Sequence, residues 1–153
     1  MRITSPAFAD KVPIPIQYTS KGANTSPPLE FFDIPDNTRS LALIARDLES
    51  ADQQVHWIVY ALDASVSYFD EGQLPDGAIE GLTSNGKTGY DGPCPEKFRD
   101  IHRISFKLYA LDTLVQLPQG SNIEAILSAI EGHILESAEV VGIVAGEQAQ
   151  ESV

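Results

Sequence analysis

Three polar side chains stand at the ends of apolar runs, where they could form one site. Asp47 closes one apolar run, His56 opens the next, and His102 immediately precedes a run that alternates between polar and apolar residues. A carboxylate can orient an imidazole and hold it charged, and partly protonated imidazoles bind small anions. The pattern therefore indicates a pocket for a small anion such as phosphate, sulfate or a carboxylate.

The strands that must position these side chains are visible in the hydropathy pattern. Residues 40–47 and 55–62 are continuous apolar runs typical of buried strands, whereas 103–112 alternates like a half-buried strand. The link between the first two is short enough for an antiparallel hairpin, which brings Asp47 beside His56. The histidine before the third strand joins them if that strand runs parallel to the second.

Side-chain parity predicts which faces these residues share, because successive side chains in a strand alternate. Asp47 and His102 have the parity of the apolar residues in their own strands. His56 has the parity of Ile58, Tyr60 and Leu62. We therefore expect all three polar side chains at the mouth of an apolar interior.

A long segment without sustained periodicity, residues 63–101, connects the second and third of these strands. It carries six of the eleven glycines, and ordered connections of this length are typical of functional sites. It ends near Gly89-Tyr90-Asp91-Gly92-Pro93-Cys94-Pro95, where glycines allow close backbone approach and prolines stiffen the chain. We expect this segment to cover the pocket and to offer backbone N–H groups to an anion.

Only one segment has clear helical spacing, and it comes late in the chain. Ser121 or Asn122 can cap it, and His133 is expected inside it as a structural or surface residue. The apolar positions of the predicted helix are Ile123, Ile126, Leu127 and Ile130, with Ile134 one turn further. Residues 140–144 return to a strand pattern. The fold class is therefore mostly β, a Greek-key-like antiparallel sandwich with a C-terminal helix packed on it.

The composition narrows the classes of partner. The chain has 153 residues, 42% of them hydrophobic, which suits one domain over residues 1–153. A net charge of −12 disfavours nucleic acid and anionic membrane surfaces. No apolar stretch approaches the ~18 residues of a membrane span, and the first residues lack a secretory pattern. With Cys94 as its single cysteine, the chain is expected to be cytoplasmic and to form no intramolecular disulfide.

Several of these segments together resemble a known family. They are Thr4-Ser5-Pro6-Ala7-Phe8, Ser26-Pro27-Pro28-Leu29, residues 40–47 with Val55-His56-Trp57, residues 89–95 with His102-Arg103, Leu108-Tyr109-Ala110-Leu111-Asp112, and Glu131-Gly132-His133-Ile134-Leu135. The ordered set is similar to the phosphatidylethanolamine-binding protein family, in its bacterial and archaeal branch of Raf-kinase-inhibitor-like proteins. The last of these segments matches the family's late helix.

The resemblance implies a β-sandwich with a small anion pocket that accommodates phosphorylated head groups. It also implies a ligand-binding or inhibitory protein acting on a kinase or a serine protease, often dimeric, without a cofactor. The pocket residues that it implies here are Asp47, His56, Gly92, Pro93 and His102.

The chain departs from the family pattern at the edge of this pocket. Asp47-Leu48-Glu49 stands where the family usually has Asp-Pro-Asp, so Glu49 keeps the second acid without the proline. Ile104 stands where a tyrosine is usual, which removes a hydroxyl donor near the ligand. Thr83 and Asn85 replace an asparagine and a phenylalanine.

The same residues leave other interpretations open. Asp47 with His56 or His102 could be the acid–base pair of a hydrolase, although a nucleophile motif such as G-x-S-x-G is lacking. The two histidines and the carboxylate could form a metal triad, but no close ligand-pair spacing supports one. Cys94 lies between prolines and is a poor candidate nucleophile. A third alternative is an interaction protein whose pocket is vestigial.

Overall fold

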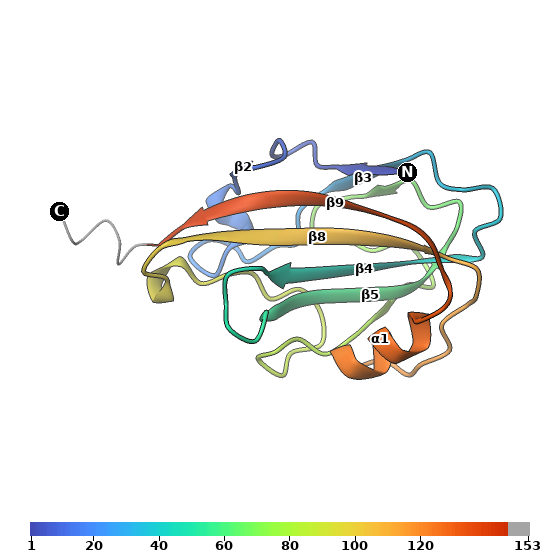
Figure 1. Cartoon of the computed structure of the whole chain (residues 1–153). Coiled ribbons are helices and arrows are strands. Elements are labelled where there is room, and N and C mark those ends of the chain that lie inside the picture. The colour runs from blue at the N-terminus through green and yellow to red at the C-terminus, as the bar shows by residue number, and fades with distance from the viewer. Residues whose placement is uncertain (147–153) are drawn as a thin grey trace.

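Two stacked β-sheets make up the fold, and Figure 1 shows one helix beside the larger sheet. The computed structural model describes residues 1–146. The larger sheet has the order β2-β9-β8-β4-β5-β7 and the smaller β1-β3-β6. The elements are β1 (Arg2–Thr4), β2 (Val12–Pro13), β3 (Leu29–Phe32), β4 (Ser40–Asp47), β5 (Val55–Asp63), β6 (Tyr68–Phe69), β7 (Ile79–Glu80), β8 (Ile101–Leu111), α1 (Ile123–Ile130) and β9 (Ile134–Ala145), with short 3-10 turns at Ile16–Tyr18 and Pro95–Lys97.

The three predicted strands are neighbours in the larger sheet. β4 lies between β5 and β8 and is antiparallel to both, so β5 and β8 run in the same direction. The end of β4 therefore meets the starts of β5 and β8 at one edge of the sheet. This geometry confirms the expected arrangement, and the mostly antiparallel sandwich with a late helix is confirmed as well.

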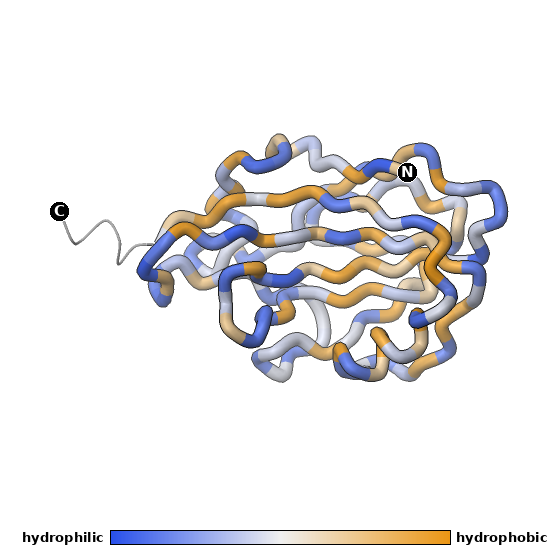
Figure 2. The backbone as a smooth tube through the Cα atoms, viewed as in Figure 1, coloured by the Kyte–Doolittle hydropathy of each residue, from blue (hydrophilic) through white to orange (hydrophobic). Residues whose placement is uncertain are grey.

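Apolar side chains fill both faces of the larger sheet. Between the sheets, Trp57, Phe69 and Phe106 belong to the interior cluster, and each such burial contributes about 1.5–3 kcal/mol. On the outer face, Ile126 and Ile130 of α1 pack in a second cluster with residues of β4 and β5. Figure 2 shows hydrophobic residues gathered along the central strands and hydrophilic ones in the turns. The site at the strand ends is thus held by a rigid, packed sheet.

A β-bulge at His56 changes the parity expected for β5. The ladder pairs Ala45 with Trp57 and then Arg46 with Val55, so it skips His56. Ile58 and Tyr60, which share its sequence parity, pack on the helix side of the sheet. Simple alternation would have placed His56 there too. A bulge changes the direction of a side chain locally. The His56 ring can therefore turn toward the loop of residues 89–95, which is called the covering loop below.

The helix is shorter than predicted. Asn122, and not Ser121, caps it, because the Asn122 side-chain oxygen accepts a 2.9 Å hydrogen bond from the Ala125 N–H. Gly132, at φ 80°, follows the last turn. Ile134 therefore begins β9, and His133 lies outside the helix.

Two details of the late segment also differ from expectation. The proposed helix stripe is only partly buried, since Leu127 remains 38% exposed. The ring of His133 bonds the Asp112 carboxylate at 2.7 Å, at the far end of β8 from His102. In residues 1–146, no helix is both long and apolar enough to cross a membrane.

Replacing Asn122 with alanine tests the assigned cap. Loss of its bond to the Ala125 amide should lower the free energy of unfolding by about 1 kcal/mol in chemical denaturation. Ser121→Ala is the matched control, because the Ser121 hydroxyl bonds the Pro118 carbonyl, and its cost should be smaller. A larger loss from the Ser121 variant would contradict the assignment.

Candidate functional site

The centre of the site is a fully buried carboxylate paired with an imidazole. Asp47 has no exposed surface, and its Oδ2 accepts a 2.6 Å hydrogen bond from Nδ1 of His102. Its Oδ1 accepts bonds from the backbone N–H groups of Glu49 at 2.8 Å and Ser50 at 3.3 Å. A buried charge is tolerated only when it is paired and hydrogen-bonded. Both oxygens of Asp47 are therefore used within the protein.

The ring of His102 is held on two sides. Phe98 stacks on it with centroids 3.7 Å apart and planes 3° from parallel, while Asp47 binds Nδ1. Its side chain is 16% exposed. Nδ1 carries a proton and donates it in the hydrogen bond to the carboxylate. Nε2 is therefore the ring nitrogen left for a ligand.

His56 is bound to the covering loop. Its Nδ1 lies 2.8 Å from the carbonyl oxygen of Asp91, and the Asp91 N–H donates to the His56 carbonyl at 2.9 Å. Burial lowers the pKa of His56, against the raising effects of the Asp91 carbonyl and of the Asp47 charge, while the charge of His102 lowers it further. The ring is therefore neutral near pH 7, with its proton on Nδ1.

Two asparagines anchor the loop that carries Asp91. The Asp91 carboxylate accepts hydrogen bonds from the side chains of Asn24 at 3.2 Å and Asn85 at 2.7 Å. Burial raises the pKa of Asp91, but these two bonds together with the charges of Lys87 and His56 bring it below its usual value. The ionised carboxylate thus fixes the position of the carbonyl that binds His56.

Gly92 was predicted to offer its backbone N–H to an anion, but in the structure it allows the loop to approach Tyr18 closely. A Cβ at this position would lie 2.3 Å from the Tyr18 carbonyl oxygen, so only glycine fits there. Its N–H donates to the Asn24 side chain at 2.8 Å, and the Pro93 carbonyl accepts from the Ser20 N–H at 3.0 Å. The Gly92 amide therefore supports the loop and is not offered to an anion.

Two other predicted site residues lie beside the cluster. The Glu49 carboxylate accepts a hydrogen bond from Arg103, and only its backbone N–H reaches Asp47. Ile104 pairs with Asp47 in the ladder and is fully buried in the interior cluster. Ile104 thus forms part of the apolar surroundings of the carboxylate, where the family tyrosine would add a hydroxyl.

A pocket of about 360 Å³ opens beside the cluster. It adjoins the loop through Gly92 and the His102 ring through Phe98, and Lys97 adds a positive charge to its wall. The complete lining is Asp52, Gln54, Ser84, Asn85, Gly92, Cys94, Lys97 and Phe98. Neither His56 nor His102 is among these lining residues.

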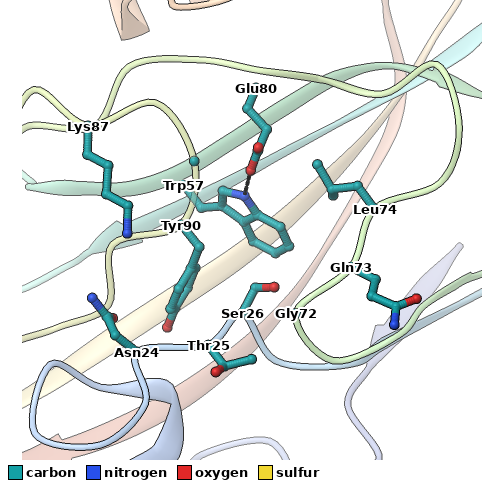
Figure 3. Close-up of a pocket in the computed structure, with 11 residues that line it drawn as sticks. Asn24, Thr25, Ser26, Trp57, Gly72, Gln73, Leu74, Glu80, Lys87 and Tyr90 are labelled. Carbon is teal, nitrogen blue, oxygen red and sulfur yellow. Dashed lines mark hydrogen bonds between the residues drawn. The ribbon is translucent and has the colours of Figure 1, made fainter.

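A second groove of about 400 Å³ is lined by Gly89 and Tyr90 of the loop and, like the first pocket, by neither histidine. Figure 3 shows Trp57 and Tyr90 beside each other in it, with the Lys87 side chain at one side. The Trp57 indole N–H donates to Glu80 at 2.8 Å. This bond holds the indole against Tyr90, with ring centroids 5.4 Å apart. Trp57 thus packs against Tyr90, a residue of the covering loop, and helps to hold the loop in place.

Sequence reasoning missed several residues of this site. Asn24 and Asn85 carried no signal for a role in the loop, because their partner lies far along the chain or on an irregular turn. Asp91 stood inside the quoted loop motif, but nothing in the motif marks its carbonyl as the partner of His56. Phe98 read as an ordinary apolar residue.

The metal alternative finds no support in the arrangement of side chains. Within residues 1–146, no three His, Cys, Asp or Glu side chains are grouped to hold a metal ion. Asp47 and His102 are instead bonded to each other. The carboxylate thus acts as an orienting group for the ring.

Known proteins match this chain over most of its length. A family profile described as "Phosphatidylethanolamine-binding protein" matches residues 4–145. A UPF0098 protein of Chlamydia pneumoniae is 43% identical over 150 residues, which cover 93% of this chain and 97% of that protein.

Two solved structures share the fold. The phosphatidylethanolamine-binding protein homologue CT736 from Chlamydia trachomatis is 38% identical, with a TM-score of 0.85 over 93% of this chain and 95% of that one. E. coli YbcL is 24% identical with a TM-score of 0.88, over 94% of this chain and 97% of that one, a likeness of fold alone.

The lowered pKa of His56 predicts a stability that depends on pH. The unfolded chain, with a His56 pKa near 6.5, takes up a proton more readily than the folded protein. The contribution of His56 is therefore complete above about pH 6.5 and is lost as the pH falls below it toward the folded-state pKa. Denaturation curves at about pH 7.5 and about pH 5.5 measure the loss.

The His56→Gln variant should lose less stability over this interval than the wild type. His133→Gln is the control, because that ring is exposed at the other end of β8, and it should keep the wild-type loss. Equal losses in all three proteins would contradict the assignment to His56.

Proposed function

Because the chain belongs to the phosphatidylethanolamine-binding protein family, we propose that it binds a small anion or a phosphorylated ligand between Asp47, His56 and His102. The observation that carries this proposal is the 2.6 Å bond between Asp47 and His102. Nε2 is the ring nitrogen that this bond leaves for a ligand, and Phe98, which stacks on the same ring, lines a pocket of about 360 Å³. When protonated, this ring donates to an anion and is balanced by the carboxylate behind it.

Charge near the pocket supports an anionic ligand in spite of the net charge of −12. Lys97 and Asp52 line the pocket with opposite charges, so its wall carries no net negative charge, and His102 lies next to it through Phe98. A ligand at this distance responds to these nearby groups more than to the distant acids, which salt screens over about 10 Å. The local environment can therefore oppose the overall field.

The hydrogen bonds favour binding over acid–base catalysis. Both oxygens of Asp47 are held by the protein, so this carboxylate orients His102 and is not placed to accept a substrate proton. Nδ1 of His56 donates its hydrogen bond to the Asp91 carbonyl. We therefore propose a binding protein, with the hydrolase as the rejected alternative.

We further propose that ligand binding serves the regulation of a partner protein, a kinase or a serine protease, as the family resemblance implies. The exposed rim residues Asp52 and Lys97 border the pocket, so a partner covering this rim would compete with the ligand. Inhibition that saturating phosphate relieves would support this arrangement.

Calorimetric titration with inorganic phosphate tests the pocket. Asp47→Asn removes the charge behind His102, and His102→Ala removes the ring, so each should weaken phosphate binding by roughly tenfold or more, the size expected for a charge-assisted bond. His133→Ala is the matched control at the opposite end of β8. Thermal unfolding confirms that the variants are folded. Titrations that are indistinguishable between the wild type and both site variants would refute the proposal.

A further inference from the structure

One asparagine of the chain is followed by glycine, and it lies in an exposed turn between β7 and the covering loop. The other three asparagines precede threonine or isoleucine, whereas Asn85 precedes Gly86. Glycine has no Cβ, so the backbone nitrogen after Asn85 is open to close approach, while a β-branched side chain crowds this nitrogen. A Cβ placed on Gly86 would have no heavy atom within 4 Å, so the space around the turn is open.

Asn85 and Gly86 together have the chemistry of spontaneous deamidation. The Gly86 backbone nitrogen loses its proton to water or hydroxide and attacks Cγ of the Asn85 amide. The new C–N bond closes a cyclic imide, and Nδ2 takes up a proton and leaves as ammonia. A water molecule then adds to either imide carbonyl and breaks its C–N bond, which gives aspartate or isoaspartate. The step consumes water, releases ammonia and needs no other reactant.

Two hydrogen bonds restrain this reaction while the turn is closed. The Gly86 N–H donates to the Thr83 carbonyl at 3.0 Å, and the Asn85 amide donates to Oδ2 of Asp91 at 2.7 Å. Residues 84–88 are nevertheless all exposed, and exposed turns with few buried contacts open at low cost. Deamidation therefore proceeds from the opened turn.

The Asn85 amide is also one of the two side-chain donors that hold Asp91. The Asp91 carboxylate accepts from Asn24 and Asn85, and the Asp91 carbonyl binds the His56 ring at 2.8 Å. A carboxylate at position 85 only accepts hydrogen bonds and has the same charge as Asp91, so it repels the group that the amide held. Isoaspartate adds a methylene to the backbone of the turn as well.

We propose that Asn85 is a site of spontaneous deamidation, and that its conversion to a carboxylate releases the covering loop from its anchor. The change runs in one direction, because the ammonia is lost to solvent. It therefore converts an anchored loop into a loosely held one as the protein ages. No ligand takes part in this step.

Peptide mass spectrometry of the intact protein, aged at mildly alkaline pH and then digested, tests the modification. The peptide with Asn85 should gain the mass difference between OH and NH₂ at least roughly tenfold faster than the peptide with Asn37, since a β-branched neighbour raises the barrier to ring closure. Asn37 is the internal control, because it is also exposed in a turn and precedes Thr38. Asn85→Gln should abolish the rapid gain, because the longer side chain closes a ring much more slowly.

Hydrogen exchange in the covering loop tests the consequence. The Asp91 N–H donates to the His56 carbonyl at 2.9 Å, and the Gly92 N–H is hydrogen-bonded as well. In the Asn85→Asp variant both amides should exchange roughly tenfold faster or more, the effect expected from the loss of one charge-assisted bond.

Asn37→Asp is the matched control for the added charge. Asn37 precedes the start of β4, at the opposite end of that strand from Asp47, so this variant should keep the wild-type exchange rates. Aged wild-type protein gives a second sample if Asn85→Asp fails to fold, since the fraction that has gained mass should show the same faster exchange.

The two measurements address the two parts of the proposal. Equal rates of mass gain at Asn85 and Asn37 would overturn the modification site. Unchanged exchange at Asp91 and Gly92 in the modified fraction would overturn the release of the loop, even where deamidation occurs.

Discussion

A carboxylate without exposed surface must be surrounded by donors, and Asp47 imposes this constraint on the whole site. The turn after β4 supplies two backbone N–H groups and β8 supplies the ring of His102. Ile104, its ladder partner, closes off the apolar side. Because an unpaired buried charge costs several kcal/mol, the hairpin turn and the start of β8 are held in one geometry. The packed sheet around them keeps these residues in fixed positions.

The covering loop holds the second histidine of the site, His56, by hydrogen bonds. Asp91 uses its carboxylate to bind two asparagines and its carbonyl to bind His56, so one residue connects the loop to the sheet twice. The absence of room for a Cβ at Gly92 keeps this segment close against Tyr18. The site therefore combines one ring oriented by a carboxylate with another oriented by a carbonyl. Burial lowers the pKa of the His56 ring, which the carbonyl holds.

Much of the architecture was predictable from local patterns. The three strands, their meeting at one edge and the helix start followed from hydropathy and capping, since these depend on residues close in the chain. The helix end was predicted one turn too late, because the apolar Ile134 continues the spacing although Gly132 interrupts the helix. Side-chain alternation could not predict the orientation of His56. A bulge depends on how two strands pair, and the sequence of one strand does not reveal it.

The amino-acid sequence alone determined that Asp47 and His102 lie on core-facing rows at the ends of their strands, because alternation and strand direction place them there. Only the folded chain decided which atoms remain available to a ligand. Hydrogen bonds from Asn24, Asp91 and the turn after β4 join residues distant in sequence, and each one removes or leaves a donor or acceptor. Such pairings depend on distances of a few tenths of an ångström in three dimensions, which no spacing along the chain encodes.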